Sequence, residues 1–298
     1  MCTAIALRGE NFYFGRNMDI YYDLDFETAR VRAEDGFSFS NGYRLSRCYG
    51  ILGTAVVRDG YPLFADAMNT EGLCMAGLEF PDLAYYFPYQ DWHKSNISPY
   101  EFIPWILTQC TSVNEAEELL ENTVLIDRPF REDLPLTPLH WMIADAKRSL
   151  AVEPTKDGLK LYDCHANVLT NAPEYPFHAV NLRQFATLTS EYPTAPNTEN
   201  APFSSGFGAI GLPGDYSSAS RFVKAAFMAK YVSIQSGETG ISDLSRALTS
   251  VAVPRGAVKA KNGNFNVTVY TSCMDIKNRK YYRFPYSPIE SGAEKADF

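Results

Sequence analysis

The chain has 298 residues, enough for one large domain or two small ones. Hydrophobic residues make up 46% and aromatic residues 14%, so the chain can bury a sizeable core. The net charge of -8 disfavours a nucleic-acid partner, because nucleic-acid-binding proteins usually carry a basic patch. The sequence has no run of about 18 apolar residues, so no membrane span is expected. The first residues lack the basic and long apolar regions of a secretory signal, which favours a cytoplasmic protein.

The spacing of cysteines and histidines indicates neither a disulfide framework nor a metal centre. The six cysteines lie at positions 2, 48, 74, 110, 164 and 273, without a CxxC pair. Widely spaced cysteines in a long chain without an export signal are typical of reduced thiols. The four histidines, at positions 93, 140, 165 and 178, match no metal-ligand spacing. We therefore expect no metal and no other cofactor.

Short apolar segments predict strands in the first third of the chain. Residues 3–7 and 11–14 are interpreted as two strands joined by a turn at residues 8–10. Further strands are predicted at residues 29–32, 50–57 and 72–78.

Capping signals predict the start of two helices. Ser98 is followed three residues later by Glu101, and Ser112 is followed at the same spacing by Glu115. A Ser N-cap with Glu three residues on is the sequence signature of a capping box. We expect a helix to begin at each serine, the second running to Leu120.

The second half of the chain adds blocks of both kinds of element. Strands are predicted at residues 139–143, 149–153, 159–164, 266–272 and 280–284, and helices at residues 177–185 and 218–231. Residues 190–214 are rich in Pro, Gly, Ser and Asn and are interpreted as a long loop, and the polar tail at residues 288–298 is expected to fray. Strands at both ends with helices between them favour an α+β fold in layers over a βαβ alternation.

Cys2 can supply both a nucleophile and its base. Methionine aminopeptidases generally act before small side chains, and removal of Met1 would leave a free α-amino group on Cys2. That amine has a reference pKa of roughly 7.7–8.0, so it can accept a proton from the thiol near neutral pH. A Met-Cys start by itself equally fits a small residue that processing merely tolerates.

Arg16 and Asp19 follow the second predicted strand closely. If the first two strands pair as a hairpin, both side chains lie beside Cys2. A nearby arginine lowers the pKa of a thiol, and Asp19 can accept a hydrogen bond from the protonated amine. The alternative is an ion pair on the surface, which stabilises little.

Several spaced motifs carry a resemblance to a known family. They are Met1-Cys2-Thr3 with Phe14–Asp19 (FGRNMD), Phe64–Leu73 (FADAMNTEGL), Leu139-His140-Trp141, Leu169–Pro173 (LTNAP), Gly211–Asp215 (GLPGD) with Ser218–Phe222 (SASRF), and Tyr270–Met274 (YTSCM). With these motifs in order over about residues 1–285, the chain resembles the choloylglycine hydrolases, which include bile salt hydrolases and penicillin V acylases.

The resemblance implies a fold and a set of roles. The fold is a single domain over residues 1–298 with the four-layer αββα architecture of N-terminal-nucleophile (Ntn) hydrolases, two stacked antiparallel sheets between helix layers. Cys2 would be the nucleophile and, through its amine, the base, with Arg16 and Asp19 orienting and tuning it. Asn171 would offer its side-chain amide to the oxyanion, and Arg221 would complete the charged network. Fixed donors at an oxyanion typically contribute a few kcal/mol each.

Glu79 is where the sequence departs from the family. Bile salt hydrolases have Asn and penicillin V acylases usually Tyr at this oxyanion-hole position, within Gly77-Leu78-Glu79-Phe80-Pro81. An ionised carboxylate would repel an oxyanion. Three arrangements remain: the Glu79 backbone N–H is the donor, the carboxyl is protonated, or the side chain turns away to bind an ammonium or amide of the substrate. We favour the backbone donor.

The resemblance also implies an apolar acyl pocket. The positions that line it in bile salt hydrolases are Met18, Ala65, Phe130, Leu134 and Leu139, all apolar here. Such walls suit a steroid, phenyl or alkyl acyl group, although ordinary core packing explains each residue equally well.

Three functions remain open from the sequence. The first is bile salt hydrolysis, releasing glycine or taurine. The second is the same chemistry on penicillin V or another N-acyl amide, and the third is a catalytically silent ligand-binding homologue. The family commonly forms homotetramers through an extended loop, for which residues 188–210 are the candidate, so we expect a homotetramer with a small-molecule substrate.

Overall fold

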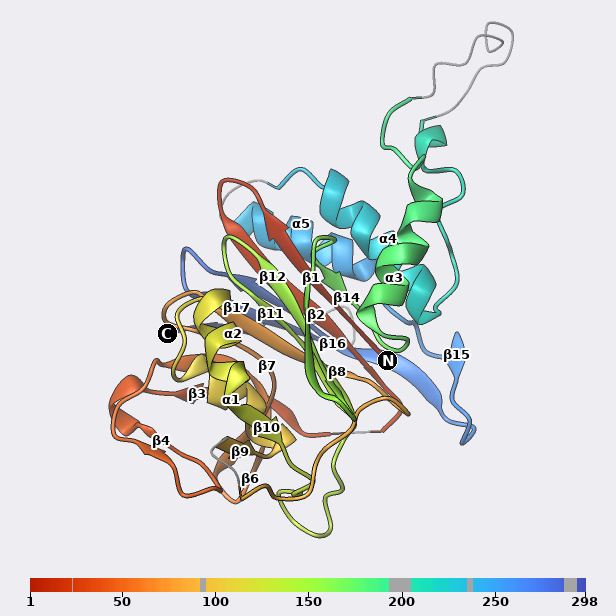
Figure 1. Ribbon diagram of the computed structural model, residues 1–298. Coiled ribbons are helices and arrows are strands. Elements are labelled where there is room, and N and C mark those ends of the chain that lie inside the picture. The colour runs from red at the N-terminus through yellow and green to blue at the C-terminus, as the bar shows by residue number, and fades with distance from the viewer. Residues whose placement is uncertain (23, 92–94, 193–204, 235–237, 287–293) are drawn as a thin grey trace, which may run out of the picture.

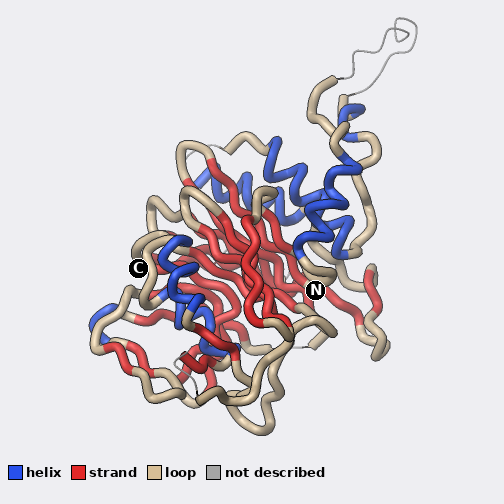
Figure 2. The backbone as a smooth tube through the Cα atoms, viewed as in Figure 1, coloured by secondary structure: helices blue, strands red, loops and turns tan. Residues whose placement is uncertain are grey.

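Two antiparallel sheets form the centre of the protein, with helices on their outer faces (Figures 1 and 2). The computed structural model describes residues 1–22, 24–91, 95–192, 205–234, 238–286 and 294–298. Within those residues each of the two sheets has seven strands. The architecture confirms the α+β fold and the two stacked antiparallel sheets of the Ntn hydrolases.

Sheet A contains the N-terminal strand as the second strand from one edge. Its order is β14-β1-β2-β16-β17-β18, with β15 paired to β16. The strands are β14 (Val168–Leu169), β1 (Cys2–Arg8), β2 (Phe12–Ile20), β16 (Phe265–Asp275), β17 (Lys280–Pro285), β18 (Glu294–Asp297) and β15 (Val258–Lys259).

Sheet B has the order β13-β12-β11-β8-β7-β6-β3. Its strands are β13 (Gly158–Asp163), β12 (Ser149–Thr155), β11 (Leu139–Ala144), β8 (Cys74–Glu79), β7 (Tyr61–Asn69), β6 (Ile51–Arg58) and β3 (Phe26–Val31). Two small pairs lie outside the large sheets: antiparallel β4 (Phe37–Ser38) with β5 (Arg44–Leu45), and parallel β9 (Ser95–Ile97) with β10 (Thr123–Leu125).

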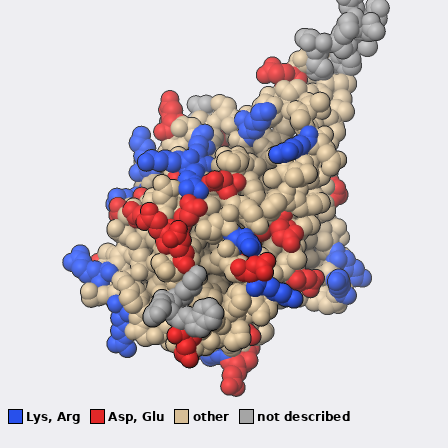
Figure 3. Space-filling view, viewed as in Figure 1, with Lys and Arg blue, Asp and Glu red and all other residues tan. Residues whose placement is uncertain are grey.

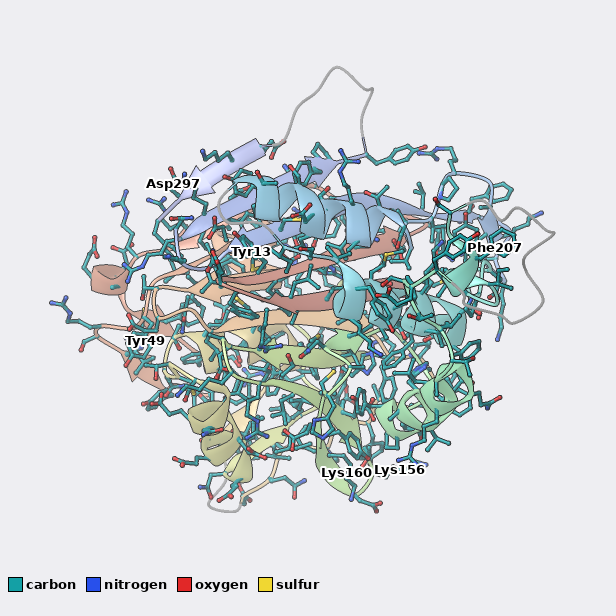
Figure 4. All side chains as sticks on the ribbon, turned by 90° about the horizontal axis from the view of Figure 1, so that it is seen from above. Tyr13, Tyr49, Lys156, Lys160, Phe207 and Asp297 are labelled. Atoms are coloured by element: carbon teal, nitrogen blue, oxygen red, sulfur yellow. The ribbon has the colours of Figure 1, made fainter. Side chains whose placement is uncertain are left out.

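Helices cover the outer face of each sheet. The five α-helices of the described residues are α1 (Phe102–Leu107), α2 (Val113–Glu121), α3 (Tyr175–Leu182), α4 (Ser218–Tyr231) and α5 (Glu238–Thr249). Helix α5 packs on β2 and β16 and α4 packs on β1, whereas α1 packs on β7 and β8. Seen from above, the order of layers is helix, sheet, sheet, helix (Figure 4).

Alternation along β8 explains why its residues are nearly all apolar. Cys74, Ala76 and Leu78 belong to the core that also includes residues of sheet A, and Met75 belongs to the core beneath α1. Successive side chains of a strand point to opposite faces, and here both faces are covered. A short run of apolar residues such as β8 is therefore a central strand of a sheet that is covered on both faces.

The exposed surface carries charges of both signs. Figure 3 shows acidic and basic side chains interspersed over the visible face, with no large region of one sign. No helix among the described residues is long and apolar enough to cross a membrane.

Most predicted elements are confirmed, including the hairpin of β1 and β2, in which Cys2 pairs with Met18. The expected helix at residues 177–185 is α3 followed by a 3₁₀ turn, Arg183–Phe185. Strand β7 and helix α5 were not predicted. Polar residues interrupt the apolar pattern of β7, among them the fully buried Asp66.

Two details of the sequence prediction were wrong. Ser98 precedes a 3₁₀ turn, Pro99–Glu101, and its side chain makes no capping bond. The Glu101 carboxylate does not complete a capping box either, because it accepts hydrogen bonds from Ser40 instead. The tail does not fray throughout, since Glu294–Asp297 pairs with β17 as β18. The second expected cap, Ser112, does accept a bond from the Glu115 N–H. Of the predicted loop at residues 188–210, residues 193–204 lie outside the described part of the chain.

Candidate active site

Cys2 is buried at the start of β1. Its side chain and backbone are 1% exposed, and the strand is held between β14 and β2. The Cys2 N–H donates to Asn171 Oδ1 at 2.8 Å. Cys2 Sγ lies 3.9 Å from Met18 Sδ on the neighbouring strand. The hairpin thus places Cys2 opposite Met18 at the start of β1, next to the N-terminus that Figure 1 marks.

Arg221 links Cys2 to Asn171. It is 1% exposed on α4, and its guanidinium donates to the Cys2 carbonyl oxygen, to Thr3 Oγ1 at 2.7 Å and to Asn171 Oδ1 at 2.6 Å. Its Nε also donates to the Tyr216 carbonyl at 3.0 Å. Burial lowers the pKa of Arg221, although the nearby Asp19 opposes the shift. The first residues of β1 are therefore fixed by a buried cation.

The Asn171 backbone is held by a hydrogen-bonded group beside the site. Ser218 Oγ accepts from the Asn171 N–H at 3.0 Å and donates to its carbonyl at 2.9 Å. His178 Nε2 lies 2.9 Å from the same carbonyl oxygen. The Asn171 Nδ2 donates to the Glu79 carbonyl at 2.8 Å. This network fixes the side-chain amide toward Cys2 and the end of β8.

Asp19 is fully buried on β2, next to Met18, the residue that pairs with Cys2. Thr268 Oγ1 donates to Asp19 Oδ1 at 2.5 Å, and Arg221 Nη1 lies 4.0 Å from Asp19 Oδ2. Among the described residues nothing hydrogen-bonds Oδ2. Burial raises the pKa of Asp19, against the opposing effects of Arg221, the N-terminal ammonium, Thr268 and Arg16. Asp19 thus presents an unused acceptor.

Arg16 lies in a buried network between the sheets. Its Nη1 is 3.3 Å from the Tyr270 hydroxyl and 3.6 Å from Asp66 Oδ2. Asp66 accepts from the hydroxyls of Tyr270 and Tyr281, each at 2.6 Å. Burial acts to lower the pKa of Arg16, but Tyr270, Cys2, Asp66 and Asp19 together raise it above its usual range. The guanidinium therefore stays charged in this buried position.

Glu79 ends β8 beside the N-terminus. In the chain that retains Met1, the Met1 ammonium donates to Glu79 Oε2 and to the Asp19 carbonyl, each at 2.6 Å. The Phe80 N–H donates to the Pro138 carbonyl, so by the alternation of an antiparallel ladder the Glu79 N–H points away from β11. The carboxylate thus binds an ammonium, and the backbone N–H points to the side where β7 and β8 no longer pair.

An apolar cavity of about 370 Å³ opens at Cys2. Cys2 and Glu79 both line it, and all five residues predicted from the resemblance do so as well: Met18, Ala65, Phe130, Leu134 and Leu139. Gly77 forms part of its wall, and a Cβ there would lie 3.1 Å from the Trp141 ring nitrogen. The absence of a side chain at Gly77 therefore leaves room for the Trp141 ring beside the cavity.

Sequence reasoning missed part of the lining and the support beneath it. Ile20, Tyr22, Leu24 and Phe26 also face the cavity, at every second position after Met18. The period of two along β2 could have identified Ile20, whereas Tyr22 and Leu24 follow that strand and Phe26 begins β3. Burial and the Glu79 carboxylate raise the pKa of Tyr22 to about 12, so its hydroxyl stays protonated. The Asp66 network has no local sequence signal, because its members come from distant strands.

The layered fold, with Cys2 at the start of β1 beside an apolar cavity, is that of the N-terminal-nucleophile hydrolases. The chain matches the model of linear amide C–N hydrolases, choloylglycine hydrolase family, over residues 2–289. It is 38% identical to a bile salt hydrolase/transferase from Lactiplantibacillus plantarum, covering 96% of this chain and 89% of the relative. The chain therefore belongs to the choloylglycine hydrolase family and is a linear amide C–N hydrolase by family.

Solved structures agree with this assignment. A crystal structure of a conjugated bile acid hydrolase variant from Clostridium perfringens superposes with a TM-score of 0.89 at 34% identity, over 99% of this chain and 92% of that one. A penicillin V acylase from Agrobacterium tumefaciens superposes with a TM-score of 0.78 at 19% identity, over 99% and 86% of the two chains, which shows the shared fold alone.

Proposed function

We propose that the protein is a cysteine-nucleophile amidase that removes the amine from conjugated bile salts. The observation that carries the proposal is the position of Cys2. Its backbone N–H donates a hydrogen bond to Asn171 Oδ1, and Cys2 lines an apolar cavity. The relatives named above as bile salt or conjugated bile acid hydrolases supply the substrate class. Apolar walls from both sheets suit a rigid acyl group such as a steroid.

The reaction begins with removal of Met1, which frees the Cys2 amine. That amine accepts the thiol proton, and Sγ attacks the amide carbon to form a tetrahedral oxyanion. The C–N bond then breaks, the amine passes its proton to the leaving nitrogen, and the acyl group remains on sulfur as a thioester. Water, deprotonated by the same amine, hydrolyses the thioester and restores the thiol.

The neighbouring residues have separate roles in this proposal. Asp19 Oδ2, the unused buried acceptor, takes a hydrogen bond from the Cys2 ammonium. Arg16 keeps a fixed positive charge near the sulfur. Asn171 Nδ2 turns from the Glu79 carbonyl to the oxyanion, and the Glu79 N–H is the second donor. Arg221 donates hydrogen bonds to both the Cys2 carbonyl and Asn171 Oδ1 and so fixes their relative positions.

A second candidate is supported by Glu79. A carboxylate at the end of the cavity is a reason to test penicillin V and other N-acyl amides beside bile salts. Turnover of any amide excludes a silent ligand-binding homologue.

The test is release of product from glycocholate, taurocholate and penicillin V by the purified protein, with intact-mass analysis of the same sample. Release of glycine or taurine by protein that lacks Met1 supports the bile salt proposal. Turnover of penicillin V alone assigns the second candidate. Processed protein that hydrolyses none of these amides contradicts both.

The proposal includes assembly and location. We expect a homotetramer, assembled through residues 188–210; the described parts of this loop extend away from the sheets beyond α3 (Figure 1). A monomer mass in light scattering would refute the tetramer. A cytoplasmic location is consistent with six free cysteines, because reduced thiols are typical of that compartment.

A further inference from the structure

Two oxygens converge on one ammonium at the end of the cavity. The Met1 ammonium donates to the Asp19 carbonyl and to Glu79 Oε2, each at 2.6 Å. The Met1 and Glu79 side chains are 23% and 29% exposed, so the pair is partly withdrawn from solvent. A charge-assisted hydrogen bond in such a position is stronger than one in open water. The chain itself thus demonstrates a cation-binding geometry beside Cys2.

The Met1 ammonium lies close to Cys2, and therefore close to where the leaving amine of a bound substrate would lie. Three covalent bonds separate the Met1 nitrogen from the Cys2 nitrogen, so the two atoms are within about 4 Å of each other. Glu79 and Cys2 line the same cavity, whose other walls are mainly apolar. An acyl group in the apolar part places its carbonyl carbon at Cys2 Sγ. The group beyond the carbonyl, which is the leaving amine, then lies beside Glu79.

We propose that the Glu79 carboxylate and the Asp19 carbonyl form a cation subsite for the leaving amine. The inference rests on the proposed amidase function and specifies its substrate. The preferred substrates are amides whose leaving amine carries a second, protonated amino group, as in an N-acyl diamine. Conjugates that end in a carboxylate or sulfonate, such as those of glycine and taurine, place like charges together and are hydrolysed less efficiently.

The neighbouring cations leave Glu79 available for this role. The Arg221 guanidinium donates hydrogen bonds to Tyr216, Cys2, Thr3 and Asn171. Arg58, which also lines the cavity, lies 3.7 Å from Asp25. The Met1 ammonium, which processing removes, is the cation that contacts the Glu79 carboxylate directly.

The experiment compares four amides with the same cholyl group. Their amines are glycine, taurine, propylamine and 1,3-diaminopropane, so the leaving group is anionic, neutral or cationic. The kcat/KM of each is measured for the processed wild type, for Glu79→Gln, and for Glu10→Gln as a matched control at an exposed position in the turn between β1 and β2. The readout is the ratio of diamine to glycine conjugate, which cancels any general loss of catalysis.

We expect the wild type and Glu10→Gln to favour the diamine amide over the glycine conjugate by about 10-fold or more, since hydrogen bonds between charged groups carry effects of that size. Glu79→Gln should bring the ratio near one. A ratio that Glu79→Gln does not change overturns the subsite while turnover upholds the amidase. An equal shift of the acidic limb of the pH profile for all four amides instead assigns Glu79 to the Cys2 ammonium and likewise overturns the subsite.

A binding measurement tests the subsite without turnover. Calorimetry compares the same diamine and glycine amides on Cys2→Ala and on Cys2→Ala combined with Glu79→Gln. Tighter binding of the diamine amide, lost in the double variant, supports the subsite even if wild-type catalysis proves absent. Equal affinities in both variants overturn it.

Discussion

The two sheets contribute different kinds of residue to the candidate active site. Sheet A and the segments on it carry the ionised and hydrogen-bonding groups: Cys2, Arg16 and Asp19 from β1 and β2, Asn171 after β14, and Arg221 on α4. Sheet B supplies mainly shape, through Ala65, Gly77, Leu139 and Trp141. Sheet B also carries charged residues, among them Arg58 and Asp66, and Glu79 brings a carboxylate from sheet B to the end of sheet A.

This difference separates reactivity from selectivity. The charged groups of sheet A are nearly unexposed, so their interactions are little screened by water and their positions are fixed by mutual hydrogen bonds. In the proposed reaction the apolar walls of sheet B contact the acyl group, so changes to these apolar residues should alter affinity more than the chemical step. Substitutions in each sheet therefore give different kinetic signatures, which the following predictions use.

The largest effect is expected from Cys2→Ala. Removal of the nucleophile should lower kcat by a factor on the order of 10⁴ or more, because the remaining groups cannot form the thioester. Circular dichroism should show an unchanged fold, since Ala fits the same strand. Hydrolysis of the best substrate from the series is the measurement.

Cys110→Ala is the matched control for this prediction. Cys110 is 2% exposed in the core beneath α1, and burial raises the pKa of its thiol to about 12. The variant should lose some stability and keep its kcat. Activity retained in Cys2→Ala and lost in Cys110→Ala would contradict the assignment of the nucleophile.

Asn171→Asp tests whether the Asn171 side-chain amide donates to the oxyanion. The substitution keeps the shape and the acceptor that Arg221 contacts, but it replaces the Nδ2 donor by an anionic oxygen. Loss of one oxyanion donor typically costs about 10²–10³ in kcat. Asn167→Asp is the control, because Asn167 Oδ1 accepts from Arg8 outside the cavity. A normal kcat in Asn171→Asp would remove Asn171 from the oxyanion hole.

Local sequence patterns were sufficient for much of the fold. The hairpin that pairs Cys2 with Met18 follows from two apolar runs and a turn, and the Ser112 cap from a four-residue motif. Both depend on interactions between neighbours in the chain. Helix α5 also carries such a signal, with Ile241, Leu244 and Leu248 at helical spacing on its buried face, but it was overlooked.

The remaining features depend on contacts between distant residues. Asp66 makes β7 look unlike a strand. Its burial is explained by Arg16 of β2 and by tyrosines from β16 and β17, which are more than 200 residues away in sequence. The family resemblance supplied the five cavity residues and the doubt about Glu79. It could not show that the Glu79 carboxylate binds an ammonium, because this contact depends on where the N-terminus and the end of β8 meet.

Leu139→Ala tests the contribution of sheet B. Leu139 lines the cavity at the start of β11, and loss of its apolar surface should raise KM by about 10-fold or more with a smaller change in kcat. Leu119→Ala on α2 removes a similarly half-buried side chain that packs beneath sheet B. The two variants should lose similar stability, but only Leu139→Ala should change KM. A fall in kcat alone would show that sheet B also positions the reacting groups.

The smallest expected effect is a change in the free energy of unfolding of Asp19→Asn. It separates the effect of burial on Asp19 from the effect of its charge pairing. Burial raises the pKa of this carboxyl in the folded protein. A group with a raised folded-state pKa contributes most stability below its unfolded pKa, and that contribution is lost as the pH rises through the folded pKa. Asp19→Asn removes this loss and keeps an acceptor for Thr268. The variant should therefore be more stable than the wild type at pH 7, with an advantage that shrinks toward pH 4.

Denaturant unfolding of both proteins across this pH range measures the difference, and Asp133→Asn provides the opposite case. Asp133 is exposed, and its hydrogen bond from Arg131 lowers its pKa, so its stabilising effect is present at neutral pH and is lost as the pH falls through the folded pKa. Asp133→Asn should thus be slightly less stable than the wild type at pH 7. If Asp19→Asn also lost stability at pH 7, the cations around Asp19 would outweigh its burial. The charged end of sheet A would then stabilise the fold as well as hold Cys2.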